Sequence, residues 1–161
     1  MSNLVKLIIC IVICQLAGVV GTIFRMDSIP TWYAALNKPL FAPPDWLFGP
    51  VWIMLYLMTG ISLFIIWKED LKNREVKTAF LIFILQLIIS VIWSFVFFGI
   101  QSITGGLILI IILWLMVILA IIRFKSISRT AVILLIPYLL WVSYITLLNF
   151  SIYKLNWSSK S

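Results

Sequence analysis

Three stretches of the sequence place large aromatic side chains beside neutral hydrogen-bonding groups, at intervals that put them on one face of a helix. The sets are Trp52, Tyr56 and Thr59; Gln86, Ser90, Trp93 and Phe97; and Pro137, Trp141, Tyr144 and Leu148, with Asn149 beside the last. Indole rings stack on flat apolar molecules, and Gln86, Ser90 and Asn149 can hydrogen-bond a carbonyl or a ring nitrogen. A single aromatic residue at helical spacing is more often a packing residue, whereas three such faces together predict a cavity for a flat, apolar ligand.

The same stretches hold no group for acid–base, proton-relay or metal chemistry. The apolar segments that contain them include no Asp, Glu, Lys or Arg, and the chain has no His. Cys10 and Cys14 lie four residues apart within an apolar run, and we expect them to pack rather than to bind a metal or act in redox chemistry. The sequence therefore predicts no metal site, no cofactor and no ion-coupled transport.

Long apolar segments must position these aromatic faces. Hydrophobic residues make up 64% of the 161 residues and the mean hydropathy is +1.20, which is outside the range of a soluble domain. A helix that crosses roughly 30 Å of hydrocarbon needs about 20 apolar residues. The sequence therefore predicts an all-α integral membrane protein, a single domain over residues 1–161 with a five-transmembrane-helix bundle. We expect the helices at residues 5–25, 45–67, 77–98, 103–124 and 130–154.

A long ordered loop is predicted between the first two helices, because five of the six prolines fall within residues 30–50, interleaved with tryptophans. A short helix is expected over residues 31–36, capped by Ser28 or Thr31, followed by a return stiffened by proline. Such a rigid aromatic segment between two helices is typical of the lid or mouth of a site.

Two features of the helices stay open at this stage. The second helix is capped either by Asp45 or by Gly49, with Pro50 just inside the helix in the second case. Pro137 removes one backbone hydrogen bond from the fifth helix, so it either kinks the helix beside Trp141 and opens a cavity or is merely tolerated.

The net charge of +7 is explained by membrane topology rather than by nucleic-acid binding. Eight of the twelve basic residues are Lys6 and those within residues 68–77 and 123–129, which five crossings place on one side. The other four are Arg25, Lys38, Lys154 and Lys160. This bias predicts a cytoplasmic N-terminus and an outside C-terminus in a bacterial plasma membrane. Residues 1–18 also allow a signal-peptide interpretation, but the apolar run continues unbroken to Phe24, which favours a helix.

These residues also form an ordered series of motifs along nearly the whole chain. The motifs are LAGVVGTIF (16–24), WYAALNKP (32–39), PPDWLFGPVWIMLY (43–56), QLIISVIWSFVFFG (86–99) and PYLLWVSYITLLN (137–149). In this order and spacing the sequence resembles the translocator protein family, also called tryptophan-rich sensory proteins or peripheral-type benzodiazepine receptors.

The resemblance implies a five-helix bundle that commonly forms homodimers and binds porphyrins such as protoporphyrin IX, sterols, and synthetic isoquinoline carboxamide and benzodiazepine ligands. It also implies that the first loop is the lid of the pocket. Carried over by motif, the pocket residues are Tyr33, Pro43, Pro44, Trp52, Tyr56, Ser90, Trp93, Ser94, Trp141 and Ile145.

Three departures from the family pattern limit what the resemblance implies. Ser90 occupies a position that usually holds Asn, which removes one amide hydrogen bond to a ligand. Gly106 and Ile110 are apolar where relatives often carry an aromatic and an acidic residue. Lys154 follows Tyr153 directly, so the spacing of the sterol motif is not met; this weakens the argument for sterol binding without excluding it.

The sequence leaves three functions open. The first is binding of a metal-free porphyrin, or of another small apolar ligand, for transport, sequestration or sensing, with Arg25 and Lys38 as the cations available for its propionates. The absence of His argues against a bound haem iron. The second, which the family resemblance allows, is light- and oxygen-dependent porphyrin degradation, in which Trp52 and Trp141 would be the catalytic residues. The third is a regulatory scaffold whose aromatic faces meet partner helices within the lipid bilayer.

Overall fold

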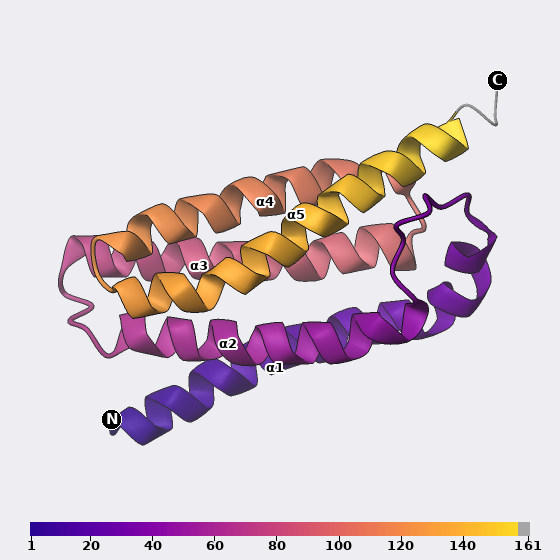
Figure 1. Ribbon diagram of the computed structural model, residues 1–161. Coiled ribbons are helices and arrows are strands. Elements are labelled where there is room, and N and C mark those ends of the chain that lie inside the picture. Colours follow the sequence, from indigo (N-terminus) through magenta and orange to yellow (C-terminus); the bar gives the residue numbers. More distant parts are fainter. Residues whose placement is uncertain (158–161) are drawn as a thin grey trace.

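The computed structural model describes residues 1–157, which form a bundle of five long helices (Figure 1). The long helices are α1 (Asn3–Ser28), α2 (Phe48–Trp67), α3 (Arg74–Ser94), α4 (Ile103–Lys125) and α5 (Arg129–Trp157). Short helical segments lie at Ile29–Tyr33 (η1), Asp45–Leu47 (η2) and Phe95–Gly99 (η3). Five helical stretches are long and apolar enough to cross a bilayer. The predicted five-helix, all-α architecture is confirmed for the described residues, and Lys160 lies outside them.

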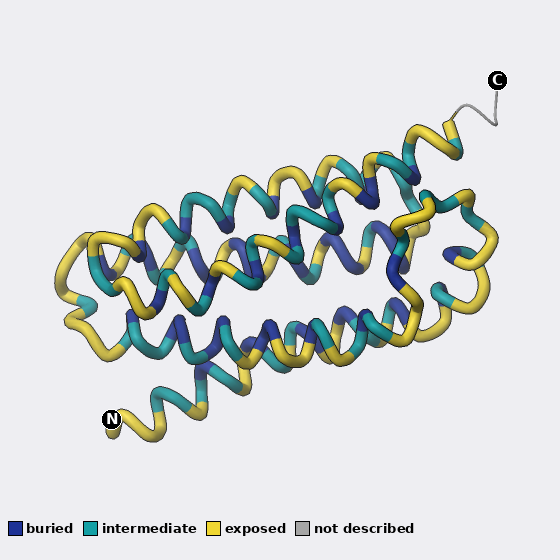
Figure 2. Tube along the Cα trace, viewed as in Figure 1, coloured by how far each residue is buried: buried dark blue, intermediate teal, exposed yellow. Residues whose placement is uncertain are grey.

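The two ends of the bundle are built from different parts of the chain (Figure 1). The N-terminus lies at the same end as the α2–α3 and α4–α5 connections, and we call this the N-terminal end. The first loop, the α3–α4 connection and the end of α5 lie at the opposite end, which we call the loop end. Buried residues line the inward faces of the helices, while exposed residues follow their outer faces (Figure 2). Most of the chain's cations, Lys6 and those of residues 68–77 and 123–129, are therefore at the N-terminal end.

The first helix extends beyond the predicted boundary at Arg25. α1 runs to Ser28 and passes directly into the wider π-helical turn of η1, which holds Pro30 at its start. The prediction of a cap at Ser28 or Thr31 is wrong: Ser28 has helical angles (φ −84°, ψ −36°) and makes no capping bond, and Thr31 Oγ1 donates to Asp27 O at 2.6 Å. Proline at the start of a turn removes a donor that the turn does not need, so the helix continues. Arg25 consequently lies within the helix rather than at its end.

The structure also decides how α2 and α3 begin. Pro44 is extended (φ −61°, ψ 143°), and the 3₁₀ turn that starts at Asp45 leads straight into α2 at Phe48. Neither predicted cap occurs, because Gly49 lies inside α2 and no side chain caps the turn or the helix. In α3 the Asn73 side chain accepts a hydrogen bond from the Glu75 amide at 2.9 Å and caps the helix, which begins at Arg74, three residues before the predicted start.

Close contact between α1 and α2 depends on Gly60. A Cβ added at Gly60 would lie 3.0 Å from Ile11 Cα and 3.2 Å from Cys10 O, both of which are backbone atoms. Cys10 and Cys14 are free, fully buried thiols on the same side of α1. Small residues commonly allow such backbone approach between membrane helices, where van der Waals packing drives association.

Gly60→Ala is therefore expected to destabilise the protein by about 1–3 kcal/mol, because the new methyl group meets backbone that cannot rotate away. Thermal unfolding in detergent, followed by circular dichroism, should show a lower midpoint for this variant. Gly49→Ala is the matched control, since an added Cβ there meets nothing within 4 Å. Equal midpoints for the two variants would show that the α1–α2 approach does not depend on Gly60.

Candidate ligand site

Aromatic side chains from η1, α2, η3, α3 and α5 meet near the loop end. We call this group the aromatic cluster; its members are Tyr33, Phe48, Trp52, Tyr56, Trp93, Phe97, Phe98, Tyr138 and Trp141. All are buried except Trp141, which is half-buried. The helical spacing of these residues in the sequence is what turns them inward together.

Trp52 occupies the centre of the aromatic cluster. Its ring stacks on Tyr56 with centroids 5.4 Å apart and an interplanar angle of 24°. It also lies 6.1 Å from the ring of Trp93 and 6.2 Å from that of Trp141, the latter edge to face. Offset-stacked and edge-to-face arrangements are the favoured geometries of aromatic pairs.

Tyr33 closes the aromatic cluster from the first loop. Its ring contacts Phe98 with centroids 5.9 Å apart and Phe48 with centroids 6.1 Å apart, and its exposed fraction is 1%. Trp32, the preceding residue, packs edge to face on Phe97 at 5.3 Å. The predicted lid is thus packed directly on the rings beneath it.

Ser90 and Asn149, two of the hydrogen-bonding residues predicted on the inner faces, pair with aromatic side chains of the cluster. Tyr56 OH lies 3.1 Å from Ser90 Oγ, which donates to Leu87 O. The indole N–H of Trp93 donates to Asn149 Oδ1 at 3.4 Å, and Asn149 donates in turn to Ile145 O.

Four donors of the aromatic cluster are buried without a partner in the described residues: Tyr33 OH, Trp52 Nε1, Tyr138 OH and Trp141 Nε1. A buried donor left unpaired costs about 1–3 kcal/mol, so native proteins rarely keep several in one place. A ligand with acceptor atoms would satisfy them.

The other predicted ligand residues are distributed unevenly. Ile145 lines the centre of the aromatic cluster. Ser94 instead faces α1, because a Cβ added at Gly21 would lie 3.0 Å from Ser94 Oγ. Gln86 is buried with its Oε1 unpartnered, and no described contact joins it to the cluster. Pro43 is buried, whereas Pro44 is exposed at the start of η2.

The aromatic cluster is closed. The hollow at its centre, between Tyr33, Trp93 and Asn149, has no room for a water molecule. The expected residues therefore meet, but as packed rings rather than as the walls of an open cavity.

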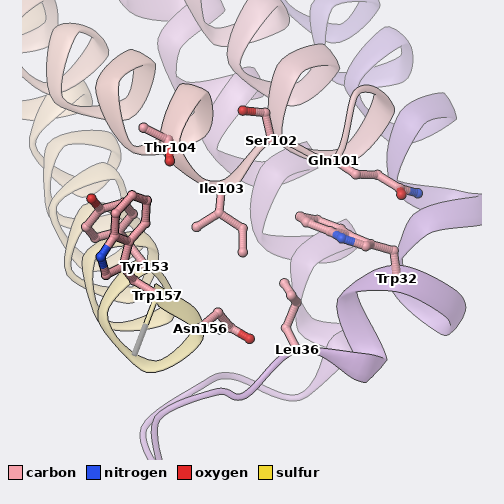
Figure 3. Close-up of a pocket in the computed structure, with 9 residues that line it drawn as sticks. All are labelled: Trp32, Leu36, Gln101, Ser102, Ile103, Thr104, Tyr153, Asn156 and Trp157. Carbon is pink, nitrogen blue, oxygen red and sulfur yellow. The ribbon is translucent and has the colours of Figure 1, made fainter. Parts of the chain in front are cut away.

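An open cavity of about 420 Å³ lies beside the cluster, at the loop end (Figure 3). Its walls come from the first loop, the α3–α4 connection and the end of α5, and the aromatic side chains among them are Trp32, Tyr153 and Trp157. Gln101, which turns the chain into α4, has a left-handed backbone (φ 61°). Sequence reasoning missed this cavity because its walls are brought together by connections rather than by a helix face.

Hydrogen bonds tie the first loop to α5. The Asn37 amide donates to Asn156 Oδ1 at 3.1 Å, and Asn156 Nδ2 donates back to Asn37 O at 3.0 Å. Tyr144 OH donates to Phe41 O at 2.5 Å. The loop is thus held closed by polar contacts at its surface as well as by Tyr33 beneath it.

Lys38 is engaged within the loop. Its ammonium donates to the carbonyls of Tyr33, Ala34 and Leu36 at 2.8–3.2 Å and lies 4.9 Å from the Tyr33 ring centroid. In the closed loop Lys38 caps a helical turn and does not extend into a cavity.

Arg25 was expected at a helix end, but it lies inside the bundle with an exposed fraction of 4%. Its Nη2 donates to Thr22 Oγ1 at 2.6 Å, and its guanidinium carbon lies 5.8 Å from the Trp52 ring centroid. The signal was present in the sequence, because Gly18, Gly21 and Arg25 share one helix face. An ionisable residue within a membrane helix is costly and usually functional.

Known proteins resemble this chain along nearly its whole length. The profile of the TspO/MBR family matches residues 10–155. The chain belongs to the TspO/MBR family. It is 43% identical over 155 residues to the tryptophan-rich protein TspO of Archaeoglobus fulgidus, covering 96% of this chain and 99% of that protein. The corresponding protein of Chlorobaculum tepidum is 39% identical over 155 residues, covering 96% and 98%. The human translocator protein is 32% identical over 138 residues, covering 85% and 82%.

Membership in the TspO/MBR family establishes the coarse character of the protein. It is an integral membrane protein, as the five apolar helices indicate. Family membership also supports a receptor-like or transporter-like role in the membrane. The resemblance drawn from the sequence motifs is confirmed.

Asn156→Ala is expected to loosen the first loop of this TspO/MBR protein, because it removes both hydrogen bonds to Asn37. Hydrogen exchange should show the Asn37 amide exchanging about tenfold faster, since each bond contributes about 0.5–1.5 kcal/mol. Thr146→Val is the matched control on α5, because the Thr146 hydroxyl bonds only Val142 O of its own helix. An unchanged exchange rate of the Asn37 amide in Asn156→Ala would show that these two hydrogen bonds do not hold the loop on α5.

Proposed function

We propose that this TspO/MBR protein binds a flat tetrapyrrole, such as protoporphyrin IX, between the rings of the aromatic cluster, for transport, sequestration or sensing. The observation that carries the proposal is the group of four buried, unpartnered indole and phenol donors within the cluster. Macrocycle nitrogens and carboxylates can accept from such donors, while the rings supply stacking surface.

Residues 34–44 of the first loop would act as the lid. The closed cluster has no space for a macrocycle, so Tyr33 must move aside for one to enter. The outer cavity is the natural entry point, because Trp32 lines it and also packs on Phe97 of the cluster. Pockets of about 300–1,000 Å³ hold small-molecule ligands. The outer cavity, at about 420 Å³, already lies in that range, and a lid displacement would join it to the cluster.

Opening of the lid would also free the Lys38 ammonium from its carbonyl partners. Lys38 is held by carbonyls of the same turn that carries Tyr33, so displacement of this turn frees its ammonium for a propionate of the ligand. A metal-free porphyrin is the favoured ligand because the chain has no His to bind a haem iron.

Light- and oxygen-dependent degradation of the porphyrin is a second candidate function. Trp52 lies 6.1–6.2 Å from both Trp93 and Trp141, so a macrocycle among them would contact indoles able to give an electron to its excited state. Molecular oxygen would be the oxidant. A scaffold that meets only partner helices is the outcome if no porphyrin binds.

The membrane placement follows from the charge distribution. In a bacterial plasma membrane, which we propose as the location, the N-terminal end would lie on the cytoplasmic side, because most of the cations lie at that end. A homodimer, implied by the family resemblance, stays a prediction.

Titration of the detergent-purified protein with protoporphyrin IX in the dark should produce a saturable shift of porphyrin absorbance, with quenching of tryptophan fluorescence. The double variant Trp52→Phe, Trp141→Phe is expected to bind about tenfold more weakly, equivalent to about 1.4 kcal/mol, because both indole donors and part of the stacking surface are lost. Trp67→Phe is the matched control, since Trp67 packs on Phe80 near the opposite end of α2.

The same titration separates the candidate functions. Binding without loss of porphyrin absorbance in light supports sequestration, transport or sensing. Light-dependent loss over many turnovers, abolished in the double variant, supports degradation. Absence of saturable binding by the wild type, or equal binding by the double variant and the Trp67 control, contradicts the proposed site.

A further inference from the structure

A groove follows the contact between α1 and α2 on the outer surface of the bundle. It consists of two adjoining hollows that share Thr22 and Met26, and we call it the α1–α2 groove. The hollow nearer the loop end, called the upper hollow, has a volume of about 200 Å³. It is lined by Thr22, Arg25, Met26, Ile29, Pro30, Asp45, Phe48 and Gly49. The lower hollow, about 240 Å³, is lined by Gln15, Gly18, Val19, Thr22, Ile23, Met26, Trp52 and Ile53. Neither hollow belongs to the closed centre of the aromatic cluster.

The upper hollow holds two opposite charges that are not paired with each other. Arg25 is one of the residues that line it; within residues 1–157 its guanidinium makes one hydrogen bond, to Thr22, and no carboxylate lies at ion-pair distance. A guanidinium has five N–H donors arranged for a phosphate or carboxylate, so most of its capacity is unused. Asp45, exposed at the start of η2, borders the same hollow. The hollow therefore offers a site for an anion and, close by, a site for a cation.

The lower hollow is mostly apolar, and the residues of α1 that line it run from Gln15 to Met26. Its walls include the exposed side chains of Val19 and Ile23, and its one amide, Gln15, is occupied by a bond to Ile53 O at 3.0 Å. From Gln15 to Arg25 the helix rises about 15 Å, which is half of the roughly 30 Å hydrocarbon core. An acyl chain that begins near Arg25 would thus end near the middle of the membrane.

We propose that the α1–α2 groove is a specific site for a phospholipid with a zwitterionic, primary-ammonium headgroup, of the phosphatidylethanolamine class. The phosphate binds Arg25, the ammonium binds Asp45, and one acyl chain occupies the lower hollow. Asp45 disfavours an anionic headgroup, which would bring a second negative charge into the same hollow. Because Arg25 also lies over Trp52, the bound lipid stabilises the arginine that supports the centre of the cluster.

Native mass spectrometry of the protein, delipidated in detergent and then given equal amounts of phosphatidylethanolamine and phosphatidylglycerol with matched acyl chains, tests this proposal. The wild type should retain phosphatidylethanolamine at least about fivefold over phosphatidylglycerol. Arg25→Gln should reduce retention of both lipids about tenfold, because the phosphate contact is common to them. Asp45→Asn should abolish the preference and leave phosphate binding intact.

Two further variants keep the test decisive. Val19→Trp fills the lower hollow from an exposed position and should displace the lipid even if the Arg25 variant fails to fold. Lys154→Gln removes an exposed cation at the loop end and should bind as the wild type does. Equal retention of the two lipids by the wild type overturns the proposal. So does retention of phosphatidylethanolamine by Val19→Trp at the wild-type level.

Discussion

Packing around Trp52 positions much of the loop end of the bundle. Its ring contacts Tyr56 on its own helix, Trp93 on α3 and Trp141 on α5, and the guanidinium of Arg25 on α1 lies over it. One indole therefore positions side chains of four helices. The site and the core are consequently the same group of residues, so any ligand that enters must replace ring-to-ring contacts with ring-to-ligand contacts of similar quality.

The lid is held by weaker forces than the cluster it covers. Three hydrogen bonds join it to α5, from Asn37, Asn156 and Tyr144, and each contributes only about 0.5–1.5 kcal/mol. Pro43 is the one buried residue of the lid, and Tyr33, the aromatic anchor just before the lid, is buried as well; the other lid residues are half-buried or exposed. Segments with few buried apolar contacts open first in native proteins. The lid can thus move while the five helices stay packed, which is what entry of a broad ligand requires.

Sequence patterns predicted the helices and the inward faces because hydrophobic length and helical period act locally. Trp52, Tyr56 and Ser90 meet as their spacing indicates. The burial of Arg25 was missed because charge was taken to mark a helix end, although Pro30 fits the π turn and lets the helix continue. The orientation of Ser94 toward α1 and the outer cavity were also missed. Both depend on how separate helices and connections approach one another, which local patterns do not specify.

The central claim is that the aromatic cluster opens to hold a flat macrocycle beneath the lid. A structure of the protein with protoporphyrin IX bound tests it most directly. We expect the macrocycle in van der Waals contact with Trp52 and Trp141, with Tyr33 displaced from Phe98. A macrocycle confined to the outer cavity between Trp32 and Trp157, over an unchanged aromatic cluster, would contradict it.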